Sequence, residues 1–70
     1  MMKSTTDKTL ASHCARALRA KGVFCEVVED PSRAYGPTRA KKWALRVNGT
    51  NGAYLVDLEA AFEGEVVKIA

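Results

Sequence analysis

A histidine, two cysteines and a pair of carboxylates are the residues of this chain whose chemistry could support catalysis. His13 and Cys14 are adjacent, and Cys25 lies further along the sequence. A cysteine and a histidine that meet in space can form a nucleophilic pair, but neighbours on a helix point in different directions. Zinc usually needs four ligands, and this set has no zinc-ligand spacing. We expect His13 to be a polar surface or boundary residue, and both cysteines to be buried, reduced thiols rather than a disulfide.

The carboxylates of Asp57 and Glu59 are close enough in sequence for acid–base work. A structural explanation suffices for Asp57, because it precedes a short apolar stretch and can cap a helix. Glu59, Glu63 and Glu65 are expected to form a solvated acidic rim. The glycines of "NGTNG" lack the lysine and the helix start of a phosphate-binding loop. We therefore predict no catalytic or metal-binding residue, no cofactor and no enzymatic activity.

The segment between Asp30 and Asp57 contains no acid and begins with a basic run, "RAYGPTRAKKWALRV", residues 33–47. Its basic residues are Arg33, Arg39, Lys41, Lys42 and Arg46, and its aromatic residues are Tyr35 and Trp43. One interpretation is a nucleic-acid surface, with basic side chains on phosphates and Tyr35 or Trp43 stacked on a base. The other is a solvated basic loop that leads into a strand, with Trp43 as the main core aromatic. The net charge of +3, from 11 basic and 8 acidic residues, does not decide between them.

The elements that position these residues begin with a helix. The chain of 70 residues has the size of one small domain, residues 1–70, and we expect residues 1–5 to fray. The residues Leu10, Cys14, Ala17 and Leu18 follow the spacing of one buried helical stripe. The hydroxyls of residues 4–6 offer N-caps, and Gly22 can close the helix in a left-handed conformation. These signals predict a helix over residues 6–21.

After Gly22 the apolar period changes to two, which indicates strands. "VFCEVVE", residues 23–29, "KWALRVN", residues 42–48, and "AYLVDL", residues 53–58, are the clearest. The Asn-Gly pairs of "NGTNG" predict a hairpin. Asp-Pro and Gly-Pro dipeptides mark residues 30–40 as a loop. A short helical turn over 58–63, closed by Gly64, and a last short strand over 65–69 complete the order.

Together these elements predict an α+β fold, in which one N-terminal helix packs on a small, three- to four-stranded, mainly antiparallel sheet. One helix cannot cover both faces of the sheet. If Trp43 faces the helix, Lys42 and Arg46 lie on the other face. Phe24, Val28 and Leu55 are expected to join them there, unless loop 30–40 folds back over these residues.

An apolar group with charged neighbours is typical of a protein interface. The sequence therefore favours a small protein-binding module, such as an adaptor, a subunit or an inhibitor, including an accessory protein of a mobile element. Its predicted partner-binding residues are Phe24, Val28, Leu55, Lys42, Arg46, Arg33, Arg39, Lys41 and Tyr35. The expected partner is another protein with an acidic patch, and a homodimer is compatible with the same surface.

Nucleic-acid binding by residues 33–46 is the alternative, and an enzyme built around His13 and a cysteine ranks last. No apolar run approaches the roughly 20 residues that a membrane span needs. The N-terminus has no apolar stretch typical of a signal peptide. We expect a cytoplasmic protein that does not contact membranes.

Overall fold

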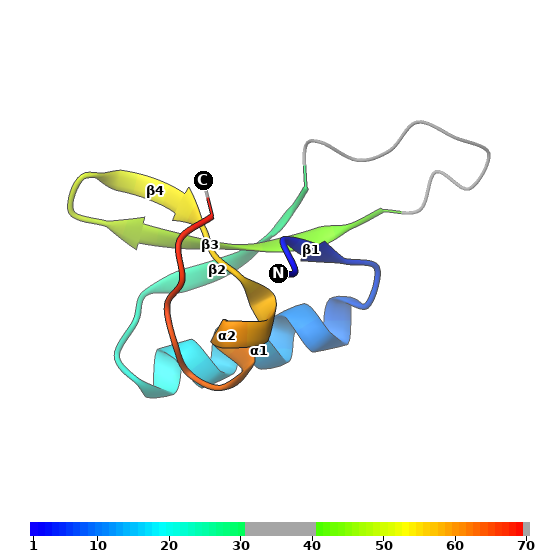
Figure 1. The fold of residues 1–70 in the computed structure, drawn as a ribbon, viewed down its shortest axis with the longest axis horizontal. Coiled ribbons are helices and arrows are strands. Elements are labelled where there is room, and N and C mark those ends of the chain that lie inside the picture. The colour runs from blue at the N-terminus through cyan, green and yellow to red at the C-terminus, as the bar shows by residue number, and fades with distance from the viewer. Residues whose placement is uncertain (31–40, 70) are drawn as a thin grey trace.

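The computed structural model describes residues 1–30 and 41–69 and has two layers (Figure 1). One layer is an antiparallel sheet of four strands, β1 (Ser4–Thr5), β2 (Cys25–Glu29), β3 (Trp43–Gly49) and β4 (Gly52–Leu55). The other layer consists of two helices, α1 (Lys8–Ala20) and α2 (Leu58–Phe62), which lie on the same side of the sheet. The predicted α+β fold class is therefore confirmed.

Strand β3 organises the sheet, because each of the other three strands pairs with it. β2 pairs along one edge of β3, and β1 and β4 share the opposite edge. In the register between β2 and β3, Val27 is the Cα partner of Leu45. In the register between β3 and β4, Val47 is the Cα partner of Tyr54. A two-residue turn at 50–51 joins β3 to β4, and this confirms the hairpin predicted from the Asn-Gly pairs.

Helix α1 begins later than predicted, because its N-cap is Asp7 and not one of the preceding hydroxyls. The Asp7 carboxylate accepts hydrogen bonds from the N–H groups of Thr9, at 3.0 Å, and Leu10, at 3.2 Å. A carboxylate satisfies these donors well and also interacts favourably with the positive end of the helix dipole. The start of the helix therefore moves from residue 6 to Lys8.

Both helices end where glycine was expected. Gly22, with a φ of 84°, and Gly64, with a φ of 81°, adopt the left-handed conformation that favours glycine. At the end of α1, the N–H of Val23 donates to the carbonyl of Leu18 at 3.0 Å, which is the six-to-one bond of a Schellman motif. The N–H of Glu65 makes the equivalent bond at the end of α2, at 2.9 Å.

The N-terminal segment, which the sequence predicts to fray over residues 1–5, is hydrogen-bonded to the rest of the fold. Ser4 pairs with Ala44 of β3 as part of the short strand β1. The N–H of Met2 donates to the Asp57 carboxylate at 2.7 Å, and the Met2 carbonyl accepts from the N–H of Leu58 at 2.8 Å. β4 covers only the later part of this edge of β3, and β1 completes the remainder.

The predicted last strand over residues 65–69 is reduced to an isolated bridge between Val56 and Lys68. Two flanking hydrogen bonds support it, from the N–H of Asp57 to the carbonyl of Val67 and from the N–H of Ile69 to that of Leu55. The fourth strand of the sheet is therefore β1 and not this C-terminal segment.

The core lies between the helices and the sheet. Its buried members are Cys14, Ala15, Leu18, Cys25, Leu45, Val47, Val56, Leu58 and Ala61. Leu45 and Val47 share one face of β3, and Val23 and Val27 pack beside Cys25 against the core, as the period of two predicts. This arrangement leaves the alternate residues of the strands on the sheet face that carries no helix (Figure 1).

Candidate functional site

The face of the sheet opposite the helices is the principal candidate for a binding surface, and we call it the open face. Strand alternation assigns to it Phe24, Glu26 and Val28 before and in β2, Ala44 and Arg46 in β3, and Leu55 in β4. The three apolar residues that were predicted for this face, Phe24, Val28 and Leu55, are thus on one side of the sheet. Ala44 is the exception in exposure, since it is fully buried.

Phe24 is the most exposed part of the open face. It lies directly before β2, and its carbonyl accepts the N–H of Asn48, so the backbone ladder extends to it. Its side chain is nevertheless 77% exposed, whereas Val28 and Leu55 are half-buried. An aromatic side chain that remains in water at the end of an ordered strand has hydrophobic area available for a partner.

An ion pair lies in the middle of the open face. Glu26 and Arg46 are Cα partners across β2 and β3, and the Arg46 guanidinium donates to the Glu26 carboxylate. Leu55 is the Cα partner of Arg46 on its other side. In register, Arg46 lies between Leu55 and β2, and Glu26 lies between Phe24 and Val28 along the strand. The charges therefore lie among the apolar residues and not only around them. The charge of Arg46 is also compensated within the chain.

The basic segment is only partly described. Lys41 is exposed and Lys42 is half-buried, and the Lys42 carbonyl accepts the N–H of Asp30 at 2.8 Å. Three predicted binding residues, Arg33, Tyr35 and Arg39, lie outside the described residues. The same holds for the alternative in which loop 30–40 covers the open face.

Trp43 faces the helical layer as predicted, but the expectation that it is the main core aromatic is wrong. It is half-buried, and the Lys8 ammonium lies 4.5 Å from the centroid of its ring. β3 begins at Trp43 and α1 begins at Lys8, so at this end of the layers the lysine covers the indole as a cation–π partner. Among the described residues, Tyr54 is the aromatic residue that packs against the core. Because Trp43 and Arg46 lie on opposite faces of β3, they do not form one stacking and phosphate-binding surface.

The residues with catalytic chemistry do not converge. His13 is exposed and stacks on Phe62, with ring centroids 4.8 Å apart. Cys14 is buried and its thiol donates to the Leu58 carbonyl at 3.3 Å, while that of Cys25 donates to the Ala15 carbonyl at 3.5 Å.

Burial raises the pKa of both thiols, because the thiolate would lose its hydration. Neither cysteine has the accessible, low-pKa environment of a nucleophile. Over residues 1–30 and 41–69, no three His, Cys, Asp or Glu side chains are grouped so that they could hold a metal ion. In the same part of the chain, neither helix has the length and apolarity needed to cross a membrane.

Asp57 has the structural role that the sequence predicts. Its carboxylate caps α2 by accepting the N–H of Glu59 and also accepts the N–H of Met2. The bond from Met2 is the main reason that the pKa of Asp57 lies below its usual value, since it stabilises the charged form. This residue therefore joins the N-terminal segment to α2.

A second surface was missed by sequence reasoning. A groove of about 370 Å³ lies in the helical layer, lined by Met2, Leu10, Leu58, Glu59, Phe62 and Glu63. Phe62 is 49% exposed there, although it ends a helix whose other apolar residues Leu58 and Ala61 are buried. The only sequence signal for this groove is the spacing of Glu59 and Glu63, which are four residues apart and flank Phe62. The same spacing is equally typical of a solvated helix face.

Comparison of the chain with known protein families, with curated proteins and with solved structures found no match.

Proposed function

We propose that this chain is a small, non-enzymatic protein-binding module that binds its partner through the open face. The exposure of Phe24 carries the proposal, because an aromatic side chain that is 77% exposed on the same face as half-buried Val28 and Leu55 offers apolar area to a partner. The Glu26–Arg46 ion pair provides donors and acceptors within the same surface. An adaptor, a subunit and an inhibitor all fit this description.

The partner that we propose carries an acidic patch next to an apolar surface. Lys41 and Lys42 lie before β3, at the edge of the open face, and the sequence places further basic residues immediately before them. Charges at the rim of an interface steer association and increase its rate more than its affinity. We therefore assign affinity to Phe24 and its apolar neighbours, and the rate of association to the basic residues.

Nucleic-acid binding remains the second candidate, on the basis of the acid-free segment between Asp30 and Asp57. Two observations weigh against it. Arg46 is paired with Glu26, and the indole of Trp43 is occupied by the ammonium of Lys8. Both would have to be released before these residues could contact a phosphate or a base.

The test is a pull-down from cell lysate with the full chain as bait, with and without nuclease, followed by mass spectrometry. Binding of the captured partner is then measured for Phe24→Ala and for Phe62→Ala, a matched control because Phe62 is also exposed but lies in the helical layer. We expect Phe24→Ala to weaken binding by more than about 1 kcal/mol, as for an interface hot spot. The control should leave binding unchanged.

The double variant Arg39→Ala/Lys41→Ala separates steering from nucleic-acid binding. On our proposal it slows association and reduces the salt dependence of the on-rate. A silent Phe24→Ala, together with a basic double variant that abolishes binding to a nuclease-sensitive target, would overturn the proposal. Nucleic-acid affinity would also fall by about 0.9 log unit per log unit of salt for each neutralised phosphate.

A further inference from the structure

The helical layer carries a second apolar surface, and the charged residues beside it are acidic, whereas those expected at the open face are basic. The groove between α1, α2 and the N-terminal segment has Leu58, which is 1% exposed, as its floor. Met2 and Leu10 are half-buried at its sides, and Phe62 remains 49% exposed although its ring stacks on His13. The lining is thus apolar and only partly covered by the chain itself.

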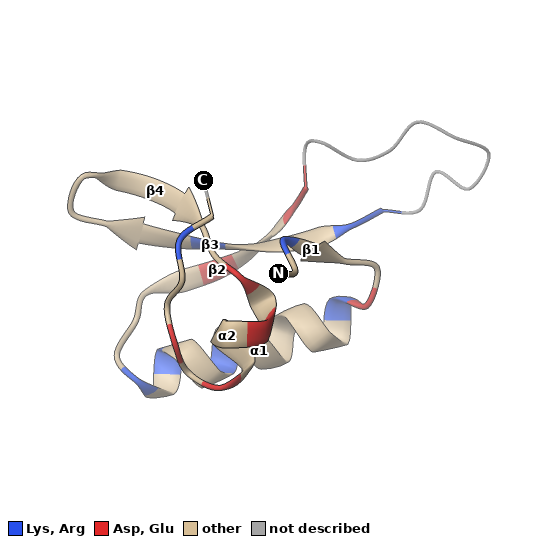
Figure 2. Ribbon diagram, in the orientation of Figure 1, with Lys and Arg blue, Asp and Glu red and all other residues tan. Residues whose placement is uncertain are grey.

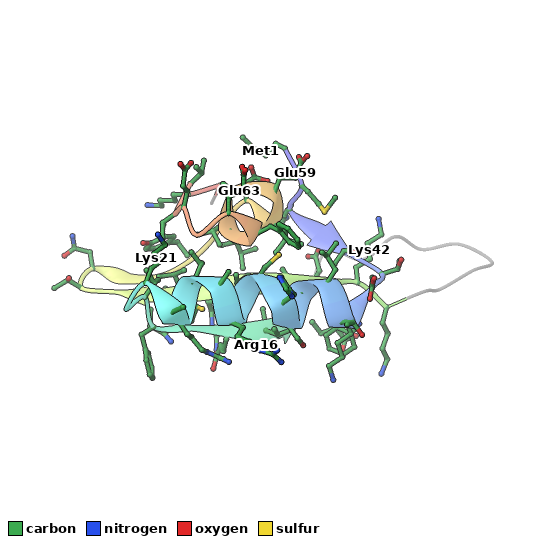
Figure 3. The ribbon with its side chains drawn as sticks, turned by 90° about the horizontal axis from the view of Figure 1, so that it is seen from below. Met1, Arg16, Lys21, Lys42, Glu59 and Glu63 are labelled. Atoms are coloured by element: carbon green, nitrogen blue, oxygen red, sulfur yellow. The ribbon has the colours of Figure 1, made fainter. Side chains whose placement is uncertain are left out.

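The rim of the groove is acidic. Glu59 and Glu63 belong to α2 and its C-cap, and Figure 3 shows both on the side of the helical layer that carries the groove. The segment that follows α2 carries one further acid, Glu65, and one base, Lys68. Basic residues lie at both ends of α1, which begins at Lys8 (Figure 2). Arg16 projects from the side of α1 that lies away from Glu59 and Glu63 (Figure 3).

Cations of the chain compensate this rim only weakly. The N-terminal ammonium lies 3.4 Å from the Glu59 carboxylate, and both groups are more than half exposed. Such solvent-exposed pairs contribute little and are readily exchanged for another cation. Lys21 lies at the C-terminal end of α2, with its stem against Gly64, the residue after Glu63, where an added Cβ would come within 2.9 Å of Lys21 Cε. Among residues 1–30 and 41–69, no hydrogen bond or ion pair holds the Glu63 carboxylate, so none has to be displaced.

We propose that this groove binds a basic amphipathic helix of another protein. Apolar side chains of that helix would occupy the groove against Phe62 and Leu10, as in other helix-in-groove complexes. Lysine or arginine side chains on its flanks would pair with Glu59 and Glu63. An acidic rim attracts such a helix and repels an acidic one, which selects this occupant over a neutral or acidic segment.

This inference is independent of the proposed function of the open face, because the two surfaces lie on opposite sides of the fold (Figure 1). A chain with an apolar surface beside basic residues on one side and an acidic groove on the other can hold two partners of opposite charge at once. The groove therefore adds a bridging role, and its test can fail or succeed whatever the open face binds.

The test is a peptide-display selection in which random 16-residue peptides are panned against the immobilised full chain. We expect the selected peptides to have a net positive charge and apolar residues at helical spacing. Their affinity, measured by fluorescence anisotropy, should fall at least tenfold for Phe62→Ala and for the double variant Glu59→Gln/Glu63→Gln. Phe24→Ala on the open face and Glu65→Gln outside the groove lining are the matched controls, and both should leave affinity unchanged.

Circular dichroism of each variant establishes that it folds, and the glutamine double variant removes charge without removing core atoms. The proposal is overturned if no peptide is enriched, if the selected peptides lack basic residues, or if they bind Phe62→Ala as tightly as the unchanged chain. Sedimentation of the chain alone tests whether a second copy of the chain occupies the groove. A dimer that Glu59→Gln/Glu63→Gln dissociates would assign the groove to a second copy of this chain and would also overturn the proposal.

Discussion

Replacing Leu18 with alanine should remove a large part of the free energy of unfolding of this protein. Leu18 lies in the last turns of α1, is fully buried, and packs in the core between the helix and the sheet. The substitution removes three carbon groups from this position, and each buried carbon contributes about 0.8 kcal/mol. The transfer contribution is therefore about 2.4 kcal/mol, and the cavity left behind raises the expected loss to about 2–5 kcal/mol.

This loss is large for a chain of this length. At about 0.05–0.15 kcal/mol per residue, 70 residues give a total stability of roughly 3.5–10 kcal/mol. Leu18→Ala is thus expected to unfold a substantial part of the population, or to lower the urea midpoint strongly. Leu18→Met, which conserves volume, should cost less than about 1.5 kcal/mol and remain folded.

The matched control is Leu10→Ala in the same helix. Leu10 is half-buried at the groove, so the same chemical change removes less buried area and leaves no closed cavity. The change in helix propensity is the same at both positions, so the difference between the two variants measures burial. Urea unfolding followed by far-UV circular dichroism gives both free energies. Equal losses for Leu10→Ala and Leu18→Ala, or a loss below about 1 kcal/mol for Leu18→Ala, would refute this account of the core.

Three further predictions concern single side chains. Burial should protect Cys14 and Cys25 from alkylation in the native protein. Mass spectrometry should then find both cysteines modified only after unfolding in urea. Rapid labelling of the native protein would contradict their burial. The pKa of Asp57 is lowered, chiefly because its carboxylate accepts the Met2 N–H. The charged carboxylate therefore stabilises the folded state above the ordinary pKa of aspartate. This stabilisation is lost as the pH falls through the lowered pKa of the folded state. Urea midpoints measured from neutral to acidic pH should therefore depend less on pH in Asp57→Asn, and an unchanged profile would exclude this contribution. Trp43, which is half-buried, should emit at longer wavelength after unfolding, and identical native and unfolded spectra would show that the indole is already in water.

The open face illustrates what sequence reasoning could and could not predict about a site. The period of two assigned Phe24, Val28 and Leu55 to one face, because side-chain direction in a strand depends only on position along it. The Glu26–Arg46 ion pair across that face depends on the register between β2 and β3, which local periodicity does not specify. The exposure of Phe24 likewise depends on which segments pack over it.

The groove was not predicted, because its lining comes from three separate parts of the chain. The hydrogen bonds that attach the N-terminal segment to Asp57 and Leu58 place Met2 beside α2, and the packing of α2 on α1 brings Phe62 and Leu10 together. In sequence, each of these residues is an ordinary apolar side chain. Their joint concavity exists only once α2 has packed beside α1.

Local rules account for what the sequence by itself determined: the fold class, the ends of the helices at Gly22 and Gly64, and the hairpin between β3 and β4. Each depends on the conformational preferences of neighbouring residues, which act before any tertiary contact exists. The tertiary structure alone decided that β1 and not residues 65–69 supplies the fourth strand, and that Trp43 lies under Lys8 at the margin of the core. Those outcomes depend on how far β3 extends beyond β4 and on where α1 begins relative to the sheet, and both distances are set by the packing of the two layers.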